Sequence, residues 1–338
     1  MKGQAMVPSG SFRSLRRACL ASAFAVLSSG FLAPLAQAAG YPDKPVRIVV
    51  AYPPGGTPDI IGRLLAARLT ARLGVTFFVE NRPGASGSIG TLSVARSAPD
   101  GYTLMMGSVQ THALNASTFR TPPYDPVKDF TAITEVAQTP NVLIVNKDFA
   151  GRTVADLLAA AKGRPGGMNF GSTGAGSTPH LAGESIKLRT KADMNHIPYK
   201  GAGPMLNDLL GGHIKLAIDN LPSSMGLIRG GSIRALAVTT LKRSPAAPDI
   251  PTLDESGLPG FDVSSWFGVF GPAGLPADVT QKLSSEIVAI MREDAVHKRL
   301  VELGCTPVGN SPDEFAAKVR AEIPKWAEVV RASGLELQ

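Results

Sequence analysis

Short apolar runs that alternate with segments of helical periodicity restrict the fold of this chain more than any other feature of its sequence. Residues 46–50, 75–80 and 102–107 have the apolar character of buried strands. Between the first two runs, residues 59–73 carry apolar side chains at helical spacing, and a Gly-rich turn opens a second helix within residues 84–96. Strands and helices that alternate in this order are typical of a doubly wound parallel sheet.

The alternation recurs further along the chain with different residues. It predicts strands at 142–145, 169–171, 214–218, 235–239 and 266–270, helices at 154–162, 181–188 and 205–210, and two C-terminal helices at 277–291 and 312–332. We therefore expect two α/β lobes, lobe 1 from residues 39–140 and 255–338 and lobe 2 from residues 141–254. A chain that crosses twice between lobes forms a hinge, and the cleft between the lobes is the expected ligand site.

The first 38 residues predict an export signal. Three arginines within residues 13–17 precede a short apolar run at 18–32, and Ala36-Gln37-Ala38 has the small-x-small pattern of a signal-peptidase site. The apolar run is shorter than the ~20 residues that span a membrane, which disfavours a membrane anchor. We expect residues 1–38 to be a signal peptide and the mature chain to begin near Ala39 in the periplasm. The choice between the general and the twin-arginine export route stays open.

Charge and motif content exclude several classes of function. The net charge is +7, but four of the 34 basic residues lie in the predicted signal, which leaves 30 basic and 27 acidic residues and no expected nucleic-acid surface. Residues 84–88 lack the last Gly of a nucleophile elbow, and no complete nucleotide-binding motif occurs. The histidines have no zinc-ligand spacing, and Cys305 is expected to be buried. We therefore expect no enzyme, no metal and no cofactor.

Two loops share a design that suits the binding of an anion. Residues 52–59 and 171–180 each follow a predicted strand, contain glycines and hydroxyls, and end near a Pro that opens a helix. Glycine lets the backbone approach a ligand, and the N–H groups at a helix start favour an anion. Either loop alone could be an ordinary turn, but the pair favours a clamp for a carboxylate or a phosphate. His180 could donate to the anion or only pack and cap its helix.

Ordered motifs along the whole chain after the signal resemble one family. The motifs are YPDKPVR at 41–47, PPGGTPD at 53–59, ENRPGA at 80–85, PDGYTL at 99–104, GxGSxxHLAGE at 174–184 and HIPYKG at 196–201. On these residues the chain resembles the solute-binding receptors of tripartite tricarboxylate transporters, the Bug-type periplasmic proteins.

The resemblance implies a two-lobed periplasmic binding protein of type II-like fold that closes on a small organic acid. It implies delivery of the acid to a two-component membrane permease, and a carboxylate held by the two loops without a matching Arg. We expect a monomer. The site residues that the resemblance implies are Gly56, Thr57 and Asp59 in the first loop, Ser172, Gly176, Ser177, Thr178 and His180 in the second, and Gln110, Asn115, Tyr199, Lys200 and Asp219 along the cleft. Pro58 and Ala116 stand where the family often has Thr and Pro, so the identity of the acid stays open.

The sequence leaves two alternatives to a receptor, an enzyme and a regulatory domain. A secreted hydrolase of small esters could use Ser177 and His180, which are three residues apart on one helix face, but no orienting acid follows from the sequence. The effector domain of a transcription regulator can share this fold. Such a regulator would need an N-terminal helix-turn-helix, and the chain has an export signal in that place.

Overall fold

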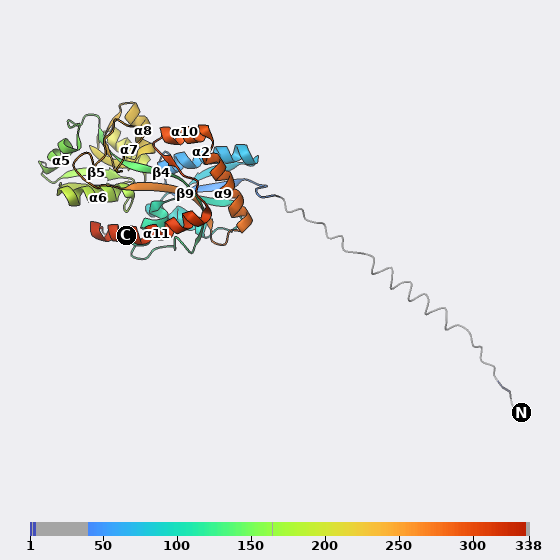
Figure 1. Ribbon diagram of the computed structural model, residues 1–338. Coiled ribbons are helices and arrows are strands. Elements are labelled where there is room, and N and C mark those ends of the chain that lie inside the picture. The colour runs from blue at the N-terminus through green and yellow to red at the C-terminus, as the bar shows by residue number, and fades with distance from the viewer. Residues whose placement is uncertain (2, 5–39, 164, 336–338) are drawn as a thin grey trace. The chain divides into compact units, whose positions relative to one another are not determined.

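A mixed β-sheet runs through the structure and positions every loop of interest (Figure 1). The computed structural model describes residues 1, 3–4, 40–163 and 165–335. The predicted export signal, apart from three N-terminal residues, and its cleavage site therefore lie outside the described residues. From Pro42 onward the chain forms one unit. No helix in the described part of the chain is both long enough and apolar enough to cross a membrane.

The strands follow one another in the order β2-β1-β3-β9-β4-β7-β5-β6, and β8 and β10 each pair with β4. The strands are β1 (Val46–Val50), β2 (Phe77–Asn81), β3 (Thr103–Ser108), β4 (Phe130–Asn146), β5 (Met168–Ser172), β6 (Met194–Pro198), β7 (Leu216–Asn220), β8 (Ile233–Val238), β9 (Ser264–Pro272) and β10 (Thr306–Pro307). The helices are α2 (Thr57–Leu73), α3 (Ser88–Ala95), α4 (Asn115–Thr118), α5 (Val154–Lys162), α6 (Thr178–Thr190), α7 (Ala202–Leu210), α8 (Leu221–Arg229), α9 (Ala277–Met291), α10 (Asp294–Glu302) and α11 (Pro312–Ser333), with short helical turns η1 (Ala85–Gly87) and η2 (Gln110–Leu114).

Two groups of parallel strands lie toward the two ends of the sheet. β1 pairs in parallel with β2 and β3, and β5 pairs in parallel with β6 and β7. Helices connect the strands within each group, as the alternation of apolar runs predicts, so the α/β class is confirmed. The sheet as a whole is mixed rather than parallel, because β9 and β4 lie between the groups and pair antiparallel with their neighbours.

The two long strands β4 and β9 join the halves of the sheet (Figure 1). The first part of β4, up to Pro140, pairs with β9, and the last part, from Asn141, pairs with β7 and β8. The sequence predicts only residues 142–145 of β4, because the earlier part carries polar side chains. The structure satisfies those side chains by tertiary contacts: buried Glu135 pairs with Lys318 at 2.6 Å, and the Thr134 hydroxyl donates to the Asn310 carbonyl.

We call the sheet around β2, β1, β3, β9 and the start of β4 the first half, and the end of β4 with β7, β5, β6 and β8 the second half. Successive side chains of a strand point to opposite faces. Accordingly Val142 and Ile144 of β4 pack into one core with α7 and α8, while Leu143 and Val145 pack into another with α5 and α6. A separate core around Phe270, Phe315 and Trp326 supports the first half.

The segment between β8 and β9 packs with the second half. Leu258 and Phe261 belong to the same core as Leu143. This packing favours a second crossing near residue 263, where β9 is about to begin, over the predicted boundary at 254. The division into lobes itself stays a prediction.

Cys305 is buried and unpaired, as the sequence predicts. Burial raises the pKa of its thiol to about 12, so the sulfur stays protonated and unreactive at neutral pH.

Phe315 anchors α11 on the first half of the sheet. Its ring is fully buried, with its centroid 4.9 Å from that of Phe270 and 5.4 Å from that of Trp266. We expect Phe315→Ala to lower the free energy of unfolding by about 3–5 kcal/mol, because it leaves a cavity in a packed core. Leu188→Ala is the control, since Leu188 is 65% exposed, and its effect should stay within about 0.5 kcal/mol. Equal effects of the two variants in urea unfolding would contradict this packing.

Candidate functional site

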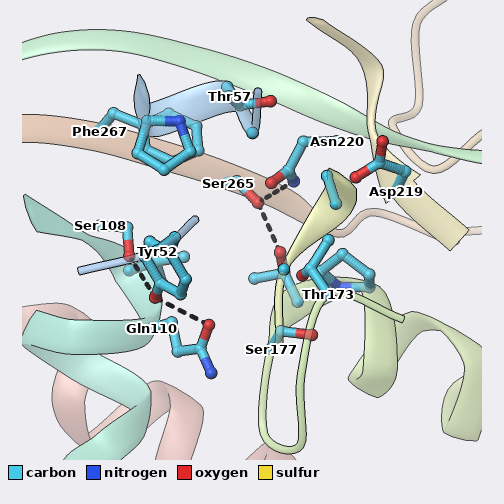
Figure 2. Close-up of a pocket in the computed structure, with 17 residues that line it drawn as sticks. Tyr52, Thr57, Ser108, Gln110, Thr173, Ser177, Asp219, Asn220, Ser265 and Phe267 are labelled. Carbon is cyan, nitrogen blue, oxygen red and sulfur yellow. Dashed lines mark hydrogen bonds between the residues drawn. The ribbon is translucent and has the colours of Figure 1, made fainter. Parts of the chain in front are cut away.

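A cavity lies where strands of both halves of the sheet end (Figure 2). It contains about 430 Å³ of space free of atoms, its opening to solvent included. Ligands of α/β proteins bind at the carboxyl ends of the strands, and β3, β5 and β7 all end at or next to this cavity. The lining residues are Tyr52, Gly56, Thr57, Pro58, Ser108, Val109, Gln110, Thr173, Ser177, Thr178, Pro179, Gly201, Ala202, Asp219, Asn220, Ser265 and Phe267.

Among the described residues, the N-termini of four helices meet at this cavity. The residues at these starts are Gly56 and Thr57 for α2, Ser177 and Thr178 for α6, Gly201 and Ala202 for α7, and Asn220 and Leu221 for α8. All of them except Leu221 line the cavity. The first N–H groups of a helix have no acceptor within the helix, and the helix dipole is positive at that end. Four such ends together favour an anion.

A network of hydroxyl and amide groups fixes one wall of the cavity. The Asn220 amide donates to the Ser265 hydroxyl at 2.7 Å (Figure 2). The hydroxyls of Thr178 and Ser265 lie 2.5 Å apart, and the Asn220 amide also donates to the Asn141 side chain at 2.7 Å. These residues come from α6, β9, β7 and β4, and all four are buried. The network therefore ties the second loop to the strands that join the two halves, and it orients the polar groups before any ligand arrives.

Ser177 holds the shape of the second loop. Its hydroxyl donates to the Gly174 carbonyl at 2.7 Å and accepts a hydrogen bond from the backbone N–H of His180 at 3.3 Å. It is thus the N-cap of α6. Because its hydroxyl donates to Gly174 and also caps α6, Ser177 fixes the conformation of the second loop at the cavity.

His180 lies behind the loop rather than in the cavity lining. Its Nδ1 accepts the backbone N–H of Gly176 at 3.1 Å, and its ring stacks on that of His196 at a centroid distance of 3.5 Å. The Ser177 hydroxyl meets only the backbone of His180, not its ring, so the pair has no nucleophile–base contact. This geometry does not support the ester-hydrolase alternative.

The predicted site residues fall into three groups in the structure. Those that line the cavity are Gly56, Thr57, Gln110, Ser177, Thr178 and Asp219. Tyr199 and Lys200 line an adjacent space, which we call the side cavity and which shares Tyr52 and Thr173 with the main one. The rest of the side cavity is lined by Ala51, Gly84, Ala85, Ser86, Gly87, Gly174, Ala175 and Pro198.

The remaining predicted residues support the loops from behind. Hydrogen bonds from Arg63, the Gly55 N–H and Asn81 hold the Asp59 carboxylate, and they lower its pKa although burial alone would raise it. The Ser172 hydroxyl oxygen lies 2.6 Å from His196 Nε2, and the Gly176 N–H donates to His180 Nδ1.

Asn115 also lies behind the cavity. Its amide donates to the Ser86 carbonyl and the Tyr124 hydroxyl, and the residue does not belong to the lining of either cavity. Its role at the ligand stays a prediction of the family resemblance.

Several lining residues were not predicted. They are Ser108, Asn220, Ser265 and Phe267, with Gly201 and Ala202 at the start of α7, while Tyr52 and Thr173 lie within the two predicted loops but were not among the predicted site residues. Ser108 and Asn220 are each the last residue of a buried strand, and a polar residue at such a place is a signal that the sequence does offer. Ser265 lies near the start of β9, and only the pairing of β9 with β4 brings it to the cavity.

Direct hydrogen bonds link the first half of the sheet to the second beside the cavity. Gln110 and Ser86 both donate to the Ala175 carbonyl at 3.2 Å, and the Thr57 hydroxyl donates to the Ser223 hydroxyl at 3.3 Å. The Tyr52 hydroxyl donates to the Gln110 side chain at 2.9 Å and so orients its amide. The loops of the two halves therefore meet over the site.

Asp219 is the one carboxylate in the cavity lining, which contains no Lys, Arg or His. The residue is fully buried, and its Oδ2 accepts hydrogen bonds from the Ser223 and Ser224 hydroxyls, each at 2.6 Å. Burial raises its pKa from 3.8 to about 6.

The raised pKa of Asp219 predicts how stability depends on pH. The folded state takes up this proton more readily than the unfolded state, so the ionised carboxylate destabilises the ligand-free protein at pH 7. The penalty is relieved as the pH falls through about 6 toward 4, by up to about 3 kcal/mol.

We therefore expect wild type to gain stability relative to Asp219→Asn as the pH is lowered from 7 to about 4, in urea unfolding of both proteins. The comparison cancels the opposite contributions of His112 and His196, since burial lowers the pKa of each to about 3. A difference between the two proteins that does not change with pH would contradict the prediction.

Comparisons with known proteins identify the family of this chain. Residues 61–335 match the family described as the tripartite tricarboxylate transporter family receptor. The chain is 38% identical to protein BugT of Bordetella pertussis over 314 residues, which cover 93% of this chain and 96% of BugT.

Two solved structures are similar over nearly their whole length. Rpa4515 of R. palustris, solved with adipate, has a TM-score of 0.85 at 41% identity and covers 87% of this chain and 99% of its own. MatC from Rhodopseudomonas palustris, solved with bound malate, has a TM-score of 0.80 at 31% identity and covers 86% of this chain and 100% of its own. The resemblance carried by the motifs is thereby confirmed, and the chain belongs to the tripartite tricarboxylate transporter receptor family, whose members are solute-binding proteins and not enzymes.

Proposed function

We propose that this receptor captures a small organic acid in the cavity between the two loops and delivers it to a two-component membrane permease. The observation that carries the proposal is the convergence of four helix N-termini on a cavity that is lined by hydroxyls and amides and by no cationic side chain. The ligands of the two similar structures, adipate and malate, are both organic acids.

Neutral donors can hold a carboxylate without a matching Arg. A hydrogen bond to a charged group contributes about 1.5–3 kcal/mol, and backbone N–H groups at a helix start are already oriented toward the anion. Thr57 and Thr178 each begin a helix at the cavity, one from each half of the sheet. A carboxylate placed between them would be held from both sides, so binding would favour contact of the two halves.

The receptor would work in the periplasm after removal of residues 1–38. The basic start, the apolar run and Ala36-Gln37-Ala38 support this proposal. Receptors of this family are periplasmic. We propose a monomer that opens and closes about the two crossings between the halves, one at Pro140 in β4 and one near residue 263 before β9.

The second loop can be tested through its cap. Ser177→Ala removes the N-cap of α6 and should weaken binding of the preferred acid by about ten- to a hundredfold, because the loop N–H groups lose their alignment. The acid is first identified by a thermal-shift screen of mono-, di- and tricarboxylates, in which a ligand at 100 times its Kd adds about 2.7 kcal/mol of stability. Isothermal titration calorimetry then compares the variant with wild type.

Thr153→Ala is the matched control. Thr153 caps α5 in the same way, by accepting the Asp156 N–H, but lies at an exposed helix start outside both cavities. Both variants should lose a similar stability of about 1 kcal/mol, and only Ser177→Ala should lose affinity. If no carboxylate stabilises the wild-type receptor, or if Ser177→Ala binds the acid like Thr153→Ala, the proposed function of this loop is wrong.

A further inference from the structure

One carboxylate oxygen of Asp219 lacks, within the described part of the chain, a hydrogen-bond partner that the ligand could provide. Its Oδ2 accepts two hydroxyl hydrogen bonds, but its Oδ1 is buried and has no hydrogen-bond partner among the described residues. Buried polar atoms in folded proteins almost always have a partner, and a carboxylate oxygen without one is costly. Since Asp219 lines the cavity, the missing partner is expected to come from whatever fills it.

The neighbours of Asp219 fix the carboxylate rather than neutralise it. Ser223 and Ser224 belong to the first turn of α8, and Ser223 also receives the hydroxyl of Thr57 across the cavity. All of these groups are neutral. The carboxylate is thus held in one orientation, with its charge left uncompensated by any side chain of the lining.

This charge restricts what can lie beside it. A second carboxylate of the ligand next to Asp219 would be repelled, because like charges in a site of low dielectric interact strongly. A hydroxyl or an ammonium group of the ligand would instead donate a hydrogen bond to the free Oδ1. The helix starts therefore favour a carboxylate of the ligand, and Asp219 favours a hydrogen-bond donor on the same small molecule.

We infer that Asp219 is a specificity-determining residue, whose free oxygen accepts a hydrogen bond from a hydroxyl or ammonium group of the ligand. The receptor then selects small carboxylic acids that carry such a donor, hydroxy acids or amino acids, over dicarboxylates without one. This inference rests on the proposed function, since the carboxylate of the same ligand is held by the helix starts. It concerns a preference among acids that the adipate and malate of the similar structures do not determine.

The test uses acids that are matched in length and differ only in the donor. Succinate has none, malate adds a hydroxyl and aspartate adds an ammonium group. Adipate, which is two carbons longer, is a further acid without a donor and is not matched in length. Isothermal titration calorimetry of the wild-type protein should show malate or aspartate binding at least about tenfold more tightly than succinate and adipate. Malate against aspartate then decides which donor the site takes.

Asp219→Asn keeps the shape of the side chain and removes its charge. The substitution should weaken binding of the donor-bearing acid by about ten- to a hundredfold and bring its affinity to within about threefold of that of succinate. Thr153→Ala is the matched control, because it removes a side-chain hydrogen bond at a helix start outside both cavities and leaves Asp219 and its neighbours unchanged. This control should keep the preference of wild type even where its melting temperature falls.

The outcomes separate the two claims. Equal binding of succinate and the donor-bearing acids in wild type overturns the inference about Asp219 and leaves the proposed function intact; a water that satisfies Oδ1 would give this result. A preference that survives Asp219→Asn, in a variant shown by circular dichroism to be folded, also overturns it. If none of the four acids nor any acid of the thermal-shift screen binds wild type, the proposed function fails and the inference fails with it.

Discussion

The N–H groups at the starts of α2, α6, α7 and α8 are the constraint on which the rest of the site depends. Parallel strands carry their carboxyl ends to one edge, and the helix that follows each strand begins there with unpaired donors. In this chain two parallel groups, one in each half of the sheet, bring such helix starts to one cavity. Such helix starts favour an anion without a cationic side chain, and on the proposed function this preference comes from the fold itself.

The strands β4 and β9 make this convergence possible. β4 runs through both halves and β9 pairs along its first part, and the buried polar groups of Asn141, Asn220 and Ser265 are hydrogen-bonded to one another where the halves meet. An uncompensated polar group at this place would be costly, so the network favours one arrangement of the strands. The same strands are the two crossings about which we propose that the halves move.

Helices and strands that are determined by the pattern of neighbouring residues could be predicted from the sequence. The helices at 154–162 and 277–291 were predicted with the bounds that the structure shows, and Thr153 with Asp156 forms a capping box at the first of them. β4 was predicted for only part of its length, because its polar side chains are satisfied by α11 and its preceding loop, far away in the sequence. α8 was missed because Pro222 and Gly226 weaken its helical pattern.

Some residues of the site could also be predicted from local patterns, and others reach it only through the tertiary structure. Thr57 and Ser177 follow from local signals, since a hydroxyl before or at a Pro-containing first turn marks a helix start. Ser265 and Phe267 reach the cavity only through the pairing of β9, which no local pattern encodes. Asp219 was placed near the cleft by resemblance, but its unpartnered oxygen is a property of the folded chain alone.

The central claim is that neutral donors of the helix starts hold the carboxylate. A crystal structure of the receptor with its preferred acid tests this claim most directly. We predict carboxylate oxygens within hydrogen-bond distance of the N–H groups at the starts of α2 and α6, between Thr57 and Thr178, with no contact to a Lys, Arg or His side chain. A carboxylate paired with a cationic side chain, such as Lys200 of the side cavity, would contradict it.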